Sequence, residues 1–210
     1  TLYSTPEEVQ ELAKLSQEKT AGNAFFLSQF LHSLYQTSLI HFDEELLKWQ
    51  WDLPGIHNAG ITDNVVELIA ERMQKLPQTT QEVLKLAACI GNQFELKTIS
   101  ILQEKSLQES YDDLWLALQE GLISISGGVS AAFQPANPSI IFKFRHDHIH
   151  QSAYSLMPIE DTKEIHLNIG RLLLWSLAWQ EEDRNLLDIV NQLNRGIELV
   201  DYSYEKQEIA

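Results

Sequence analysis

The hydrophobic pattern of residues 140–154 changes its period in the middle, and this change constrains the fold most. The first half ends in an apolar–polar–apolar alternation at Phe142-Lys143-Phe144, which is the pattern of a half-buried strand. The apolar residues that follow recur at helical spacing, and Asp147 stands where a helix N-cap would. We therefore expect a strand to end and a helix to begin at Arg145-His146-Asp147. Free backbone N–H groups at a helix start favour anions. A histidine at this corner can therefore sense whether a phosphate is bound there.

Composition excludes several classes of partner. The chain has 210 residues, 44% of them hydrophobic and 21% charged, which is ordinary for a globular protein of one large or two small domains. The net charge of −15 argues against DNA, RNA or an anionic membrane as the partner, because phosphate binding needs clustered Lys and Arg. The single Cys89 cannot form an internal disulfide, and no apolar run is long enough to span a bilayer. We expect a cytoplasmic protein that binds neither nucleic acid nor membrane.

Residues 1–76 are predicted to form a helical subdomain with a small β-hairpin. Helical patterns begin at Pro6 and at about residue 23, and a third begins after a cap within residues 62–64. Two short strands are predicted at residues 39–42 and 48–51, with Trp49 and Trp51 packed on one face. Residues 52–60 are predicted to be loop. Pro77 cannot lie inside a helix, so Leu76-Pro77 is predicted to be a domain boundary.

Residues 77–157 show the element order of a winged-helix domain. A capping-box pattern at residues 79–82 precedes the first helix, which ends at Gly91-Asn92. Further helices are predicted at residues 94–102 and 107–119, and Gly121 is suited to a left-handed cap. Strands are predicted at residues 122–125 and 140–144, separated by a loop over residues 127–139.

Residues 158–210 are predicted to be helical again, with helices over about 161–179 and 185–199. Such a helix pair after a globular core is how an α-solenoid of the tetratricopeptide type begins. The chain starts at Thr1 rather than Met and stops within a helical pattern at Ala210. We therefore expect a segment of a larger protein of mostly α fold class.

Four motifs in order resemble one family of proteins. They are Lys19-Thr20-Ala21-Gly22-Asn23-Ala24-Phe25-Phe26-Leu27, Ile61-Thr62-Asp63-Asn64-Val65-Val66-Glu67-Leu68, Leu86-Ala87-Ala88-Cys89-Ile90-Gly91 and Phe144-Arg145-His146-Asp147. Nearly the whole chain resembles the part of the signal-transduction ATPases with numerous domains (STAND) that follows their nucleotide-binding core. It is most similar to the AAA-type ATPase segment of bacterial, often cyanobacterial, multi-sensor Ser/Thr and histidine kinases.

This resemblance implies a regulatory role and a set of site residues. In the family, the helical lid and the winged helix close over ADP bound to the core and hold the protein inactive. Gly22-Asn23-Ala24 matches an element near the adenine, with Ala24 where the family has a proline. His146 matches the histidine that reaches the ADP β-phosphate, with Arg145 in place of a methionine, and Asp147 would cap the following helix. ADP or ATP would thus be held by the upstream core, and we expect none to bind tightly to this chain alone.

Catalytic and metal sites are not predicted. The sequence has no Gly-x-x-x-x-Gly-Lys-Ser/Thr loop and no apolar strand ending in paired acids for Mg²⁺, so this chain should not hydrolyse ATP. His146 and His150 have the i, i+4 spacing of zinc ligands, but the sequence offers neither the adjacent glutamate nor a third ligand. Cys89 lies in an apolar run and is expected to be an inert buried thiol.

Our hypothesis is a non-catalytic module that couples the nucleotide state of an upstream P-loop core to downstream helical-repeat and kinase domains. It would move as a rigid body about Leu76-Pro77 or about Pro158. Two alternatives stay open. One is a protein–protein adaptor without nucleotide coupling, which a groove beside Trp49 and Trp51 would favour. The other is a DNA-binding winged helix, although its recognition helix at residues 107–119 contains three acids and no Lys or Arg.

Overall fold

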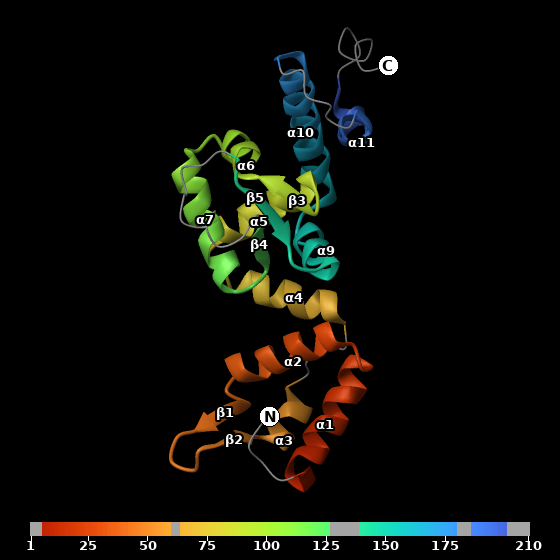
Figure 1. The fold of residues 1–210 in the computed structure, drawn as a ribbon. Coiled ribbons are helices and arrows are strands. Elements are labelled where there is room, and N and C mark those ends of the chain that lie inside the picture. Colours follow the sequence, from red (N-terminus) through yellow and green to blue (C-terminus); the bar gives the residue numbers. More distant parts are fainter. Residues whose placement is uncertain (1–5, 60–63, 127–138, 180–185, 201–210) are drawn as a thin grey trace. The chain divides into compact units, whose positions relative to one another are not determined.

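Helices make up most of the protein, with two small antiparallel sheets, which confirms the predicted mostly α fold class (Figure 1). The structure is a computed structural model and describes residues 6–59, 64–126, 139–179 and 186–200. The chain divides into two compact units, unit 1 from Thr1 to Lys75 and unit 2 from Leu76 to Ala210. The division falls beside Leu76-Pro77. The predicted loop over residues 127–139 lies, except for Ser139, outside the described residues.

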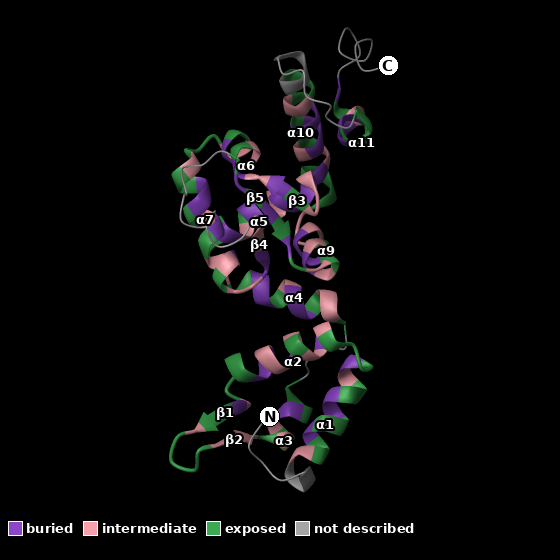
Figure 2. Ribbon diagram, viewed as in Figure 1, coloured by how far each residue is buried: buried purple, intermediate pink, exposed green. Residues whose placement is uncertain are grey.

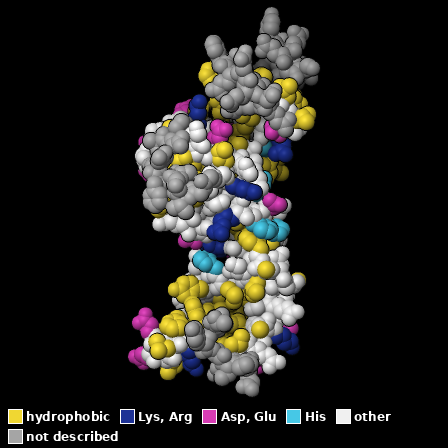
Figure 3. Space-filling model, viewed as in Figure 1, with side chains coloured by type: hydrophobic (Ala, Val, Ile, Leu, Met, Phe, Trp, Pro, Cys, Tyr) yellow, Lys and Arg dark blue, Asp and Glu magenta, His cyan; other side chains and the backbone are white. Residues whose placement is uncertain are grey.

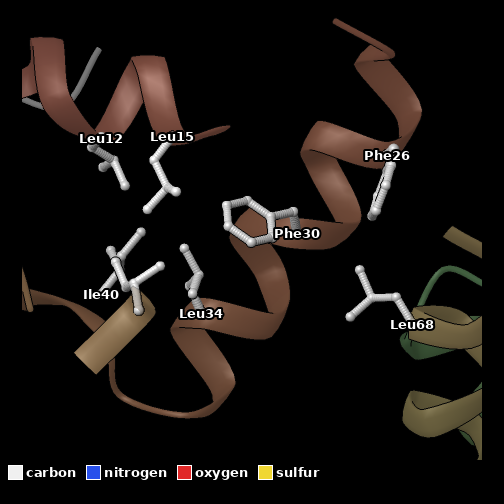
Figure 4. Packing of buried hydrophobic residues seen from close by; sticks show 8 residues of the cluster. Leu12, Leu15, Phe26, Phe30, Leu34, Ile40 and Leu68 are labelled. Atoms are coloured by element: carbon white, nitrogen blue, oxygen red, sulfur yellow. The ribbon is translucent and has the colours of Figure 1, made fainter. Parts of the chain in front are cut away.

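Unit 1 combines helices with a two-stranded hairpin. Its core is built on one face of its second helix, where Phe26, Phe30 and Leu34 follow at intervals of four residues and are buried. Figure 4 shows Phe30 directed toward Leu15 of the first helix and Leu34 directed toward Ile40 of the first strand. Full burial of one such side chain contributes roughly 1.5–3 kcal/mol. The elements of unit 1 are α1 (Pro6–Thr20), α2 (Ala24–Gln36), β1 (Ile40–Asp43), β2 (Lys48–Trp51), α3 (Leu53–Asn58) and α4 (Val65–Gln74).

The hairpin packs as the sequence predicted. Ile40 is paired with Trp51, and Phe42 with Trp49, so these four side chains share one face. Both tryptophans are partly buried against the core of unit 1.

The predicted loop at residues 52–60 is wrong, because residues 53–58 form α3. The Asp52 carboxylate accepts a hydrogen bond from the Gly55 N–H at 3.0 Å and so caps this helix. Pro54 lies in the first turn, where a missing N–H costs nothing. The capping residue Asp52 and the early Pro54 were visible in the sequence, but a six-residue helix is too short to show an apolar period.

Unit 2 contains a three-stranded antiparallel sheet among its helices. Figure 2 shows buried residues interrupted by exposed ones along α7 and α10, the pattern of helices with one face in a core. The strand order is β3-β5-β4, with Phe94 opposite Phe142. The elements are α5 (Gln78–Ile90), β3 (Gln93–Glu95), α6 (Leu96–Gln103), α7 (Leu107–Gln119), β4 (Ile123–Ser126), β5 (Ile141–Phe144), α9 (Asp147–Ser155), α10 (Ile159–Trp179), α11 (Leu186–Gly196) and the 3-10 turn η1 (Ile197–Leu199).

Two local predictions in unit 2 are wrong. Phe94 belongs to β3 rather than to a helix, because its backbone pairs with β5 and its ring stacks on Phe142 at 5.6 Å. The capping box at residues 79–82 does not form, since α5 begins at Gln78 with Pro77 at the N-cap and no side-chain cap. The left-handed cap is confirmed, as Gly121 has φ +69° beyond the end of α7.

Helices α10 and α11 approach each other closely at two glycines. A Cβ atom on Gly170 of α10 would lie 2.6 Å from Leu193 Cδ2 of α11. A Cβ atom on Gly196 would lie 2.6 Å from both Leu167 Cβ and the Lys163 carbonyl oxygen of α10. The two helices therefore pack through reciprocal glycine contacts. That they begin an α-solenoid stays a prediction.

Candidate functional site

His146 itself caps α9, which corrects the prediction that Asp147 does so. Strand β5 ends at Phe144, and His146 has the extended backbone of an N-cap residue. Its Nδ1 atom accepts a hydrogen bond from the His148 N–H at 3.3 Å. Asp147 is the first helical residue, where its charge suits the helix dipole, and its carboxylate accepts a 3.4 Å hydrogen bond from the Asn92 amide.

The cap fixes which ring nitrogen of His146 can donate. Because Nδ1 accepts the backbone hydrogen bond, the neutral imidazole carries its proton on Nε2. A donor at Nε2 is what a phosphate oxygen needs. The ring is half-buried and stacks on His148, with 5.0 Å between ring centroids. Capping and phosphate contact thus use different nitrogens of the same side chain and do not exclude each other.

His150 does not join His146 in a metal site. Its Nε2 donates to the Ala88 carbonyl oxygen of α5 at 2.8 Å, which attaches α9 to α5. Among the residues that the structure describes, no three His, Cys, Asp or Glu side chains are grouped to hold a metal ion.

Gly22, Asn23 and Ala24 connect α1 to α2 in unit 1, whereas His146 lies in unit 2. Asn23 is the N-cap of α2, and its side-chain oxygen accepts the Phe26 N–H at 3.0 Å. Gly22 has φ +75°, a conformation that glycine adopts without strain. All three residues are exposed. The element is a tight, capped connection between two helices, and its predicted contact with an adenine stays a prediction.

A polar network centred on the buried His166 and Gln192 joins four helices of unit 2. His166 of α10 is 1% exposed, and its Nδ1 atom lies 2.5 Å from the side-chain oxygen of Gln192 on α11. The Gln192 amide nitrogen donates to the Cys89 carbonyl oxygen at 2.9 Å, near the C-terminal end of α5. Tyr154 of α9 places its hydroxyl 3.0 Å from His166 Nε2, and Arg195 reaches the same nitrogen at 3.3 Å. We call these four side chains the His166 network.

The partners determine the protonation of His166. The Gln192 amide nitrogen donates to carbonyl oxygens, so its oxygen is left to accept from Nδ1–H. Arg195 can only donate, so Nε2 must accept. Both demands are met by the neutral imidazole with its proton on Nδ1. Burial lowers the pKa of His166 below its usual 6.5, the Gln192 hydrogen bond opposes this, and the Arg195 charge lowers the pKa further.

The sequence contained a weak signal for this network. His166 follows Ile165 and precedes Leu167 within a predicted helix, which places a polar ring close to an apolar face. Gln192 likewise stands between Asn191 and the buried Leu193. No rule of spacing connects residues 166, 192 and 89, because their contact depends on how α10 and α11 pack against α5.

The lowered pKa of His166 predicts a pH effect on stability. The unfolded chain takes up a proton on His166 near pH 6.5, whereas the folded chain resists protonation until a lower pH. The free energy of unfolding should therefore fall as the pH drops below about 6.5 and be unaffected by this residue above it. Urea unfolding between pH 5 and 8 checks the slope. In the variant His166→Gln, the free energy of unfolding should depend less steeply on pH than in the wild type. An equal dependence in both proteins would contradict the lowered pKa of His166.

An open pocket of about 780 Å³ lies beside the network. It is lined by the end of α5, by β3, and by α9 and α11, and it includes Tyr154, Gln192 and Arg195. Cys89 borders the pocket, and burial raises the pKa of its thiol to about 12. Its sulfur lies 3.7 Å from Met157 Sδ. At neutral pH such a thiol stays protonated, so it is no nucleophile.

Comparison with known proteins gives one informative similarity. The chain is 31% identical to hybrid signal transduction histidine kinase G of Dictyostelium discoideum, over an alignment of 241 positions covering 95% of this chain. It is related to a segment of a signalling kinase. That segment spans only 7% of the length of the relative. No protein-family model matches the chain, and no solved structure matches it significantly. None of the described helices is long and apolar enough to cross a bilayer.

Proposed function

We propose that this chain is a non-catalytic regulatory segment of a signal-transduction ATPase. It would couple the ADP or ATP state of an upstream P-loop core to downstream helical-repeat and kinase domains. Two observations support this proposal besides the resemblance of the four motifs: the relation to a segment of a signalling kinase, and the element order of unit 2. Three helices (α5, α6 and α7) and the antiparallel sheet β3-β5-β4 agree with the predicted winged helix, which stays a prediction.

The relation to a segment of a signalling kinase is the observation that carries the proposal, and the His166 network bears on where such a module would move. A coupling module must transmit a movement from the part that senses nucleotide to the part that contacts the next domain. The network ties α10 and α11 to α5 through buried hydrogen bonds and to α9 through a part-buried one, so it joins residues before and after Pro158. Movement at Pro158 would break these bonds in a buried site, which is costly. Of the two junctions considered from the sequence, Leu76-Pro77 is therefore the one we propose as the hinge.

His146 is proposed as the residue that responds to ADP. Its Nε2–H would donate to the β-phosphate held by the upstream core, while Gly22-Asn23-Ala24 would lie near the adenine. A hydrogen bond to a charged phosphate is worth about 1.5–3 kcal/mol. This is the size of a typical allosteric coupling, about 1–3 kcal/mol. One such contact is enough to favour a closed, inactive state over an open one.

The test separates the two roles of His146. Asparagine is also a good N-cap, but its shorter amide does not extend to the position of Nε2. In the intact parent protein, we expect His146→Asn to weaken ADP binding about tenfold, equal to about 1.4 kcal/mol. It should leave the melting temperature unchanged. His146→Ala should weaken ADP binding equally and also destabilise the fold by about 1 kcal/mol, because the cap is lost.

Isothermal titration with ADP and a thermal melt give both readouts. Wild-type ADP affinity in His146→Asn would overturn the sensor role, even if His146→Ala lowers the melting temperature. These two results together would mean that His146 acts only as a structural cap.

A further inference from the structure

The tip of the β1–β2 hairpin carries large hydrophobic side chains on the surface of unit 1. Leu46 and Leu47 in the turn are 59% and 70% exposed. Tyr35, at the end of α2, is 56% exposed, and Phe42 of β1 is 41% exposed. Figure 3 shows hydrophobic side chains gathered over unit 1, with acidic side chains at one edge. Exposed apolar side chains that cluster in this way mark interaction sites more often than singly scattered ones.

Phe42 shares one face of the hairpin with Ile40, Trp49 and Trp51, and Tyr35 of α2 contacts this face. At the inner end of this face, Ile40 is buried and the opposite Trp51 packs against the core of unit 1. At the outer end, the Trp49 ring contacts Phe42 at 5.7 Å and Tyr35 at 5.9 Å, both edge to face. The core explains the inner pair and Trp49, which also packs against it. It does not explain why Phe42 and the two leucines of the turn are apolar.

The turn holds its leucines in a defined shape. The Asp43 carboxylate accepts hydrogen bonds from the Glu45 and Leu46 N–H groups, both at 2.9 Å. Leu47 has φ +49°, a left-handed conformation in which glycine or asparagine is usual. A leucine at that position is unfavourable for the isolated turn and exposes its side chain to water.

We propose that Tyr35, Phe42, Leu46 and Leu47 form a docking surface for a protein that offers an apolar pocket bordered by Lys or Arg. A hairpin turn is convex, so its partner must be concave. Glu44 and Glu45 are exposed in the same turn and would pair with basic residues at the rim of that pocket. The same two charges oppose insertion of the leucines into an anionic membrane. This inference goes beyond the nucleotide-coupling function and does not depend on it.

Photo-crosslinking at position 47 tests the proposal. The intact parent protein, with a benzophenone amino acid in place of Leu47, is irradiated in its own cells, and the adducts are mapped by mass spectrometry. The expected adduct is a protein, joined at an apolar segment flanked by Lys or Arg. With that purified partner, the double variant Leu46→Ser, Leu47→Ser should bind at least tenfold more weakly. Glu44→Lys with Glu45→Lys should bind more weakly at low salt, and its binding should strengthen as salt is raised, the reverse of the wild type.

Leu187 of α11 provides the matched control, because it is a leucine with 69% exposure in unit 2. Leu187→Ser should bind the partner as the wild type does, and a cross-linker at position 187 should give different adducts. Four results would overturn the proposal. They are adducts at position 47 that match those at 187, adducts with lipid, a contact segment lined by acids, and unchanged binding by the double serine variant.

Discussion

Replacing Gln192 by methionine is expected to destabilise unit 2 by about 4 kcal/mol. Methionine has a similar length, so packing is largely kept and the loss is of hydrogen bonds. His166 Nδ1–H then has no acceptor at Gln192, and the Cys89 carbonyl oxygen loses its donor. A buried polar group left unsatisfied costs about 1–3 kcal/mol, and here there are two. Urea unfolding followed by circular dichroism at pH 7.5 measures the change.

Two further variants distinguish the network from general packing. Asn191→Met makes the same replacement at an exposed neighbour on α11 and should cost less than about 0.5 kcal/mol. The double variant His166→Leu, Gln192→Met removes both partners, and its cost should be smaller than the sum of the single costs. Strict additivity, or a Gln192→Met protein as stable as the wild type, would show that the network contributes little.

Replacing Gly196 by alanine is expected to destabilise the α10–α11 pair by about 3 kcal/mol. The new Cβ atom would lie 2.6 Å from the Lys163 carbonyl oxygen, which is backbone and cannot rotate away. Overpacking of a close contact costs about 1–3 kcal/mol and more when backbone must shift. A loss of 3 kcal/mol lowers the melting temperature of a domain of this size by roughly 10 °C.

The matched control for Gly196→Ala is Asn194→Ala, two residues earlier on the exposed side of α11. Alanine is the better helix former, so this variant should be neutral or slightly stabilising. Hydrogen exchange of the α10 and α11 amides gives a local readout. Faster exchange in Gly196→Ala, confined to these two helices, is the expected result. An unchanged melting temperature in Gly196→Ala would mean that the helices are not packed as closely as the structure indicates.

Much of the secondary structure of this chain was predictable because its signals are local. Helix α7 was predicted with its observed bounds, since its apolar spacing and the left-handed Gly121 require no knowledge of the rest of the chain. Strand β3 was not, because three residues are too few to show alternation. Phe94 becomes part of a strand through its pairing with β5, which is more than 40 residues away in sequence.

In the candidate site too, the local features were predictable and those that depend on tertiary packing were not. The strand-to-helix corner at His146 followed from the change of hydrophobic period, and the structure places a cap there. Which residue caps was not predictable, because Asp147 is chemically the better candidate and only the backbone geometry selects His146. The His166 network was missed altogether, since residues 89, 166 and 192 meet only through tertiary packing.

On the function we propose, unit 2 transmits the nucleotide state as one rigid body. The most direct measurement is the signalling output of the intact parent protein with ADP and with ATP, comparing wild type with Gln192→Met at a temperature where both are folded. We predict that Gln192→Met binds ADP with wild-type affinity, yet its output no longer differs between the two nucleotides. An output that still responds to ADP as in the wild type would contradict transmission through the His166 network.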